Sequence, residues 1–313
     1  MRHIQFGIQT SPHHVSYGEL AQLWQRADAL GYDSGWLFDH FMPISGDSAG
    51  PCFEGYTMLT ALMMQTRRMH GGLLVTSALY RNPGVLAKMA ATLDIVSGGR
   101  LEVGLGAGWF EGEAKAFGLP FPPTGARLAM LDETVQVLRS LWTNETTDFV
   151  GQHFTLIGAR CNPRPLQKPT PTLWVGGQGE KVTLRIVAQR ADGWDMDMAP
   201  LPDYARKLDI LNDHGARFGR DIASIKKMIH FSAIIAETEA DVAARAEALA
   251  LRWKTSVDGL RGRVLIGTPE QAAEVLRPYA ALGAEHFVLS LQAPYDTRMV
   301  ELFINEVAPR LRT

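Results

Sequence analysis

The sequence is poor in cysteine, in long apolar runs and in any excess of positive charge. Its two cysteines, Cys52 and Cys161, exclude a disulfide framework and any CxxC metal or redox motif. The longest apolar runs, such as LTALMM at 59–64, fall far short of the ~20 residues that span a bilayer. Polar Gln5 and Gln9 interrupt the N-terminal segment, so we expect no signal peptide and a soluble, cytoplasmic protein. With 31 basic against 33 acidic residues, the chain lacks the cationic surface of nucleic-acid or membrane-surface binders.

Strand-like and helix-like segments alternate along most of the chain. The helices are marked by start signals: Ser16 and Glu19 fit a capping box, and Asn82 before Pro83 fits a cap and first helical position. We expect strands at 4–9, 34–38, 71–76, 101–105, 172–176, 192–195, 228–236 and 286–291. Strict alternation favours a parallel sheet, and eight units favour a (β/α)8 TIM barrel forming one domain over residues 1–313.

One stretch, residues 143–171, breaks the alternation. Within it, DFVGQHFTL has the pattern of a β-hairpin, and the proline-rich CNPRPLQKPTP cannot be helical. We therefore expect an insertion after the fourth βα unit of the barrel.

Glycines cluster where two predicted strands end, which is the edge where barrels of this kind carry their active sites. GLGAGW at 104–109 is not a dinucleotide fingerprint, because the third glycine position is Trp109. WVGGQGEK at 174–181 runs from a strand to a helix N-terminus, whose N–H groups suit a phosphate, with Lys181 or Arg185 as additional cations. The alternative is that both clusters only make tight turns.

Polar residues at strand ends are the candidates for chemistry. Asp39 either accepts a hydrogen bond from a ligand N–H or caps a loop, and His40 either moves a proton or is a buried structural histidine. Glu111 follows the GLGAGW strand end, so it either faces the pocket or stabilises a helix N-terminus. His13 and His14 have no partner at metal-ligand spacing, and we expect no metal.

Three segments together resemble the luciferase-like monooxygenase superfamily, and within it the branch that uses the deazaflavin coenzyme F-420. They are WLFDHF at 36–41, RNPGVLAKMAATLDIVSGGRLEVGLGAGWFEGE at 81–113 and PTPTLWVGGQGEKVTLRIVAQRADGW at 169–194. The resemblance runs in order from about residue 4 to residue 200. It implies a (β/α)8 barrel and a homodimer, with the coenzyme ring across the C-terminal mouth.

The resemblance also implies roles for particular residues. A bulge with a non-prolyl cis peptide in the third strand, in the region of Leu73, Leu74 and Val75, would back the ring. His40 would be the catalytic proton donor or acceptor, with Glu111 a second candidate. The implied coenzyme contacts are Asp39, Leu74, Val75, Thr76, Gly106, Ala107, Gly108, Gly176, Gly177, Gln178 and Gly179. Some members of the branch carry a Trp just after the Asp-His pair and a catalytic Glu just after strand four. Here no Trp follows His40, and the Glu is shifted to Glu111, which weakens the expectation of a sugar-phosphate dehydrogenase.

The leading hypothesis is an oxidoreductase that transfers a hydride between coenzyme F-420 and a small organic substrate. One alternative is an FMN-dependent monooxygenase that receives reduced flavin from a partner reductase and uses molecular oxygen. A second is a non-catalytic flavin-binding protein on the same barrel. The sequence carries no readable signal for the identity of the substrate.

Overall fold

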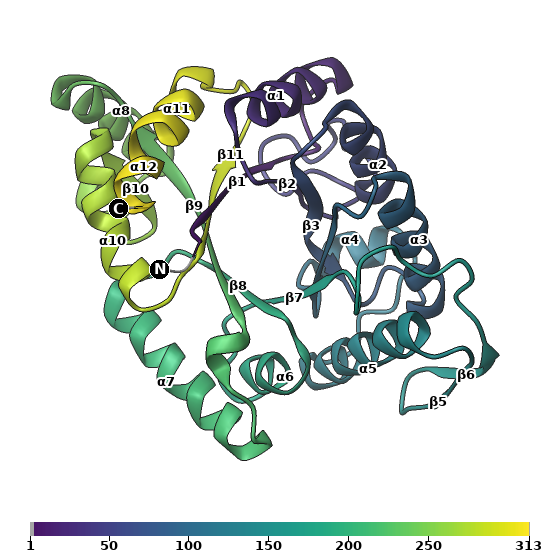
Figure 1. Cartoon of the computed structure of the whole chain (residues 1–313). Coiled ribbons are helices and arrows are strands. Elements are labelled where there is room, and N and C mark those ends of the chain that lie inside the picture. The colour runs from purple at the N-terminus through teal and green to yellow at the C-terminus, as the bar shows by residue number, and fades with distance from the viewer. Residues whose placement is uncertain (1–2, 313) are drawn as a thin grey trace.

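A closed barrel of parallel strands forms the centre of the computed structural model, which describes residues 3–312. Within these residues, eight strands follow one another around the barrel, and β11 pairs with β1 to close it (Figure 1). They are β1 (Gln5–Thr10), β2 (Ser34–Leu37), β3 (His70–Ser77), β4 (Leu101–Gly106), β7 (Thr172–Gly176), β8 (Gly193–Asp197), β9 (Lys226–Ile235) and β11 (His286–Leu291). All eight predicted strands are present, and the predicted (β/α)8 barrel is confirmed.

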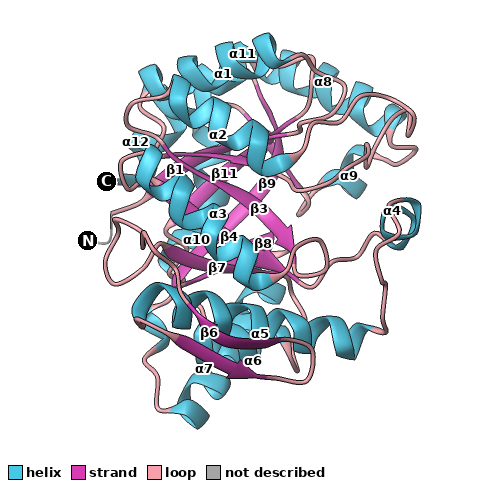
Figure 2. Ribbon diagram, turned by 90° about the vertical axis from the view of Figure 1, so that its right-hand side faces the viewer, coloured by secondary structure: helices cyan, strands magenta, loops and turns pink. Residues whose placement is uncertain are grey.

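Helices surround the barrel, and Figure 2 shows both chain ends at one end of it and the short helices α4 and α9 at the other. The helices between strands are α1 (Tyr17–Leu30), α2 (Gly55–Gln65), α3 (Pro83–Val96), α4 (Glu111–Ala116), α5 (Thr124–Thr143), α6 (Thr183–Arg190), α7 (Leu201–Phe218), the 3-10 turn η1 (Ile222–Ser224), α8 (Glu239–Arg252), α9 (Val257–Leu260) and α10 (Pro269–Ala281). The chain ends in α11 (Thr297–Leu302), the π-helical turn η2 (Phe303–Val307) and α12 (Ala308–Arg312). Among the described helices, none combines the length and the apolar character needed to cross a bilayer.

The predicted helix start signals act as expected. The Ser16 side chain accepts from the Glu19 backbone N–H while the Glu19 side chain accepts from the Ser16 N–H, so α1 begins with a capping box. The same helix ends at Gly31, whose φ of 97° is the left-handed conformation that glycine adopts without steric cost. Asn82 caps α3 by accepting from the Gly84 N–H.

The irregular stretch before β7 contains the predicted hairpin. Strands β5 (Thr147–Val150) and β6 (Thr155–Ala159) pair antiparallel and form a separate two-stranded sheet at the periphery of the molecule (Figure 1). Whether this hairpin is an insertion relative to other barrels stays a prediction.

One strand was missed. β10 (Val264–Gly267) pairs with the last four residues of β9, from Ser232 to Ile235, of which Ser232 also pairs with β11 in the barrel. β10 is a short strand outside the alternation of one strand and one helix that predicts the barrel strands, so the sequence gives no signal for it.

Large side chains fill the barrel interior and form the floor of a cavity. Trp36 and Trp174 meet edge to face at 6.2 Å, and Met228, Val288 and Leu74 pack with them in one buried cluster. The barrel is thus a packed core rather than a pore, and open space begins only above Leu74, at the carboxyl ends of the strands.

Candidate functional site

A cavity of about 630 Å³ opens at the carboxyl ends of the barrel strands. Seven of the eight barrel strands contribute lining residues, from Gln9 on β1 to Ser290 on β11, and residues 38–40, just after β2, line the cavity as well. Its volume suits a cofactor or a substrate of drug-like size, and its position is the one where barrel enzymes carry out their chemistry.

The floor of the cavity is apolar and is shaped by an irregularity in β3. The ladder between β3 and β4 shifts register between Leu73 and Thr76, and the peptide bond between Leu74 and Val75 is cis, as the resemblance implied. Leu74 and Val75 both line the cavity. The bulge therefore presents two aliphatic side chains to any ligand that lies across the mouth.

Two glycines make room for this bulge. A Cβ added to Gly106 would lie 2.5 Å from Cγ2 of Val75, and one added to Gly176 would lie 2.7 Å from Cγ1 of the same residue. Real Cβ contacts are not this short, so neither position accepts a side chain unless Val75 moves. The glycine clusters at the ends of β4 and β7 thus have a function beyond tight turns: they allow Val75 to stand between them.

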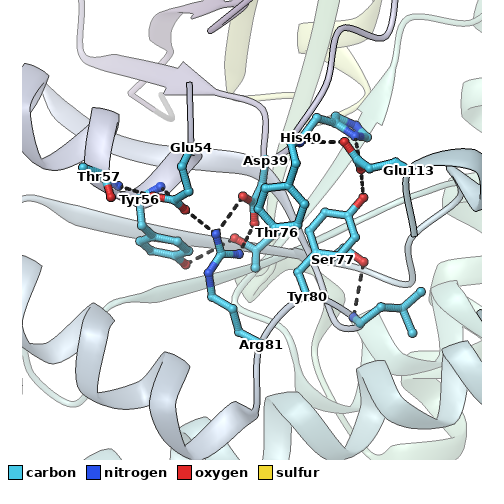
Figure 3. A network of polar contacts seen from close by, with 12 residues as sticks. Asp39, His40, Glu54, Tyr56, Thr57, Thr76, Ser77, Tyr80, Arg81 and Glu113 are labelled. Atoms are coloured by element: carbon cyan, nitrogen blue, oxygen red, sulfur yellow. Dashed lines mark hydrogen bonds and ion pairs between the residues drawn. The ribbon is translucent and has the colours of Figure 1, made fainter. Parts of the chain in front are cut away.

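His40 lies at the cavity wall and is held by a buried carboxylate. Its Nδ1 donates to Oε2 of Glu113 at 2.9 Å (Figure 3), and the Glu113 side chain has no exposed surface. The His40 ring also meets the Trp109 ring edge to face at 5.6 Å. Because Nδ1 carries the proton in this hydrogen bond, the neutral imidazole presents Nε2 as an acceptor.

Glu113 also ties down the segment after His40. Its Oε1 accepts from the backbone N–H groups of Phe41 and Met42 at 2.6 and 3.1 Å, and its Oε2 accepts from the Tyr80 hydroxyl. Burial alone would raise the pKa of this carboxyl, but the hydrogen bonds from His40 and Tyr80 outweigh it and lower the pKa below its ordinary value. Glu113 is therefore ionised at neutral pH and orients the His40 ring.

Asp39 belongs to a second network beside the first (Figure 3). Both of its carboxylate oxygens accept from Arg81, with Nη2 to Oδ1 at 3.0 Å, and Arg81 also binds Glu54 and lies over the Tyr56 ring. Although burial opposes the charge, the carboxylate of Asp39 raises the pKa of Arg81 above its usual value. The Asp39 carboxylate has no exposed surface, so it is not positioned to accept a hydrogen bond from a ligand.

A third charged group stands on the wall formed by β8 and β9. Nδ1 of His230 is 2.8 Å from Oδ1 of Asp195, and Nε2 is 2.8 Å from Oδ1 of Asp197. Burial alone would lower the pKa of His230, but the two carboxylates raise it well above its usual value. His230 is therefore a cation between two anions, and the cluster of Asp195, Asp197 and His230 carries a net charge of about −1.

The glycine loop after β7 leads into α6. Gly177 has a φ of 127°, a conformation that a side chain would strain, and no side chain caps the N-terminus of α6. Gly177, Gly179 and Thr183 line the cavity at this point. Uncapped N–H groups at a helix start are suited to a phosphate.

Comparison with known proteins matches this arrangement to one family. Residues 3–256 match the family model described as luciferase-like monooxygenase. The chain belongs to this family. The chain is 24% identical to an F-420-dependent glucose-6-phosphate dehydrogenase of Amycolatopsis mediterranei, over 99% of both chains. It is 29% identical to an F-420-dependent glucose-6-phosphate dehydrogenase 2 of Rhodococcus jostii, over 99% of this chain and 98% of that one. An F-420-dependent secondary alcohol dehydrogenase, solved with an F-420–acetone adduct, shares its fold with a TM-score of 0.86 at 21% identity, over 99% of this chain and 100% of the other.

The luciferase-like fold gathers most of the predicted site residues around one cavity. Those that line it are Asp39, His40, Leu74, Val75, Gly106, Ala107, Gly108, Gly176, Gly177 and Gly179. Three do not line it. The buried Thr76 hydroxyl donates to the Tyr56 hydroxyl, the Gln178 carbonyl accepts from Lys207, and Glu111 is exposed and paired with Lys115. Glu111 therefore does not face the pocket, because it stands on the outer side of α4.

The residues that the sequence reasoning missed are Glu113, Arg81, Asp195, Asp197 and His230. A signal existed for Glu113. Glu111 and Lys115 at i and i+4 mark the solvent face of α4, which leaves Glu113 on another face. Asp195 and Asp197 alternate along β8 and so share one side of the strand.

Proposed function

We propose that this protein is an oxidoreductase that transfers a hydride between coenzyme F-420 and a small organic substrate. The observation that carries the proposal is the His40–Glu113 pair beside an apolar floor framed by glycines. The F-420-dependent dehydrogenases among its relatives support the choice of coenzyme.

The cavity fits a flat coenzyme that carries a phosphate. Leu74 and Val75 would support the ring, because Gly106 and Gly176 leave the space that their positions need. The uncapped start of α6, with Gly179, would hold the phosphate through backbone N–H groups, whereas the N–H of Gly177 already donates to the Asp195 carbonyl. The bound coenzyme supplies the hydride acceptor or donor.

The chain itself would manage the proton. Nδ1 of His40 donates to Glu113, so Nε2 is the nitrogen that takes a proton from a substrate hydroxyl during oxidation and returns it during reduction. The ionised Glu113 would stabilise the imidazolium that forms. Trp109, at the mouth, would limit the access of water to His40.

A coenzyme titration tests the proposal. We expect the fluorescence of F-420 to change on binding, and we expect His40→Ala to lower turnover by about 10²-fold or more while leaving F-420 affinity nearly unchanged. His153→Ala is the matched control, because His153 follows β5, away from the cavity lining. Unchanged turnover in His40→Ala would remove His40 from the mechanism.

Other results of the same titration would favour the FMN-dependent monooxygenase or the non-catalytic flavin-binding protein. Tight binding of FMN with none of F-420, together with oxygen consumption when reduced flavin is supplied, would select the monooxygenase that depends on a partner reductase. Binding of a coenzyme without turnover of any alcohol or carbonyl compound would select the non-catalytic flavin-binding protein. We propose a homodimer from the family resemblance, and sedimentation equilibrium tests it.

A further inference from the structure

The cluster of Asp195, Asp197 and His230 faces the cavity but has no part in the proposed proton transfer. Asp197 and His230 are directly paired across the β8–β9 ladder, and Asp195 lies two residues earlier on the same side of β8. All three line the cavity, together with Ser232. The cluster therefore forms one wall of the space that a substrate would occupy.

Asp197 is the member of the cluster that a ligand can reach. The side chain of Asp195 is 5% exposed and that of His230 is 18% exposed, whereas that of Asp197 is 76% exposed. Both ring nitrogens of His230 already bind carboxylates, so the histidine has no N–H left for an anion. What the wall offers is carboxylate oxygen, which accepts hydrogen bonds from hydroxyl and ammonium groups.

Apart from the start of α6, which the proposed function assigns to the phosphate of the coenzyme, the cavity lining offers no cation to an anionic substrate. Among its lining residues in the described chain, none is lysine or arginine, while Asp39, Asp195 and Asp197 are acidic. Arg81 lies nearby but is bound to Asp39 and Glu54. A phosphate ester would therefore face the carboxylates of Asp195 and Asp197 and would find no cation among the lining residues.

One exposed cation comes close from outside the lining. Arg263 stands just before β10, and its charge is among the influences that lower the pKa of Asp197, after the hydrogen bond from His230 and against the effect of burial. With Arg263 counted, the wall carries a charge of about zero, so it is not cationic.

We propose that the substrate carries no phosphate or carboxylate group, and that a hydroxyl or ammonium group of the substrate hydrogen-bonds to Asp197. The proposal rests on the proposed function, because it assigns the substrate class of the same cavity. It separates this protein from its relatives that are named for glucose 6-phosphate.

Three ligands on one sugar scaffold test the charge preference: glucosamine, glucose and glucose 6-phosphate. F-420 binding is measured first, by fluorescence, so that failure of the proposed function is seen separately. Each sugar is then titrated by calorimetry into the F-420-loaded protein at low salt. We expect glucosamine to bind about tenfold or more tightly than glucose 6-phosphate, with glucose between them.

Two variants test whether the preference for glucosamine arises at Asp197. Asp197→Asn keeps the size of the side chain and should weaken glucosamine binding about tenfold, whereas Asp213→Asn on the exposed face of α7 should not change it. Tighter binding of glucose 6-phosphate than of glucosamine would overturn the proposal. If Arg263→Gln then abolished the binding of glucose 6-phosphate, Arg263 would be identified as the residue that binds the phosphate. Glucosamine binding that is absent, or equal in wild type and Asp197→Asn, would overturn it as well.

Discussion

Replacing Glu113 by glutamine removes a charge but almost no volume, and its effect follows from the four hydrogen bonds that the carboxylate accepts. Two donors meet Oε1, from the backbone of Phe41 and Met42, and two meet Oε2, from His40 and Tyr80. Glutamine has one carbonyl oxygen and one NH2 group. If the carbonyl meets the two backbone N–H groups, the NH2 group faces His40 and Tyr80, which can accept from it only after the imidazole changes tautomer and the hydroxyl rotates. Hydrogen bonds to a charged group contribute about 1.5–3 kcal/mol and neutral ones about 1 kcal/mol, so we expect Glu113→Gln to lose about 2–4 kcal/mol of unfolding free energy.

Two assays report on this variant. Circular dichroism should show a thermal midpoint lower by about 5 °C. Turnover should fall by about 10²-fold, because His40 loses the anion that orients its ring and stabilises its protonated form. Glu111→Gln is the matched control on the same helix, and we expect no change in either measurement, because Glu111 is exposed.

The pH dependence of stability and of turnover shows whether Glu113 positions His40 or only stabilises the fold. The folded pKa of Glu113 lies below its ordinary 4.5, so its contribution to stability is complete above about pH 4.5 and is lost as the pH falls through the lowered value. Glu113→Gln should show a smaller loss of stability between neutral and acidic pH, and its pH–rate profile should shift. A variant with the wild-type melting temperature and pH–rate profile would refute the assigned role of Glu113.

Three further substitutions test other parts of the structure. Gly106→Ala places a methyl group 2.5 Å from Val75, so F-420 affinity in a fluorescence titration should fall tenfold or more. The control Gly125→Ala, where nothing lies within 4 Å of the added methyl group, should bind F-420 normally. Equal affinities of the two variants would contradict the assigned role of the bulge. Asp28→Ala leaves three backbone N–H donors before β3 without their acceptor and should lose about 2–4 kcal/mol in urea unfolding. Ser16→Ala removes the capping box of α1 and should cost about 1 kcal/mol in the same assay, and no loss would show that the cap is dispensable.

The barrel was predictable because its signals are local. Ser16 with Glu19, Gly31, and Asn82 with Pro83 mark where helices begin or end, and the short apolar segments between the helices are then favoured as strands. β10 was missed because it adds a strand beside β9 that does not belong to the βα alternation.

The site was predictable only where a residue stands at a strand end. His40 follows β2 directly, and the position of β2 in the barrel places it at the cavity. Its partner Glu113 is 73 residues further along the chain, on a helix of six residues, and Glu111 was the more conspicuous carboxylate. The pairing of Asp197 with His230 depends on the register between β8 and β9, which no local pattern specifies.

The far end of β9 belongs to a small structure with a core of its own. Ile234, Ala246, Ala250, Leu260 and Val264 form a hydrophobic cluster separate from that of the barrel, built from the end of β9, α8, α9 and β10. None of these elements except β9 takes part in closing the barrel. We therefore expect substitutions within this cluster to disturb the barrel core little, and because Arg263 lies in the same segment and its charge acts on Asp197, changes there would alter the surroundings of Asp197 from outside the cavity.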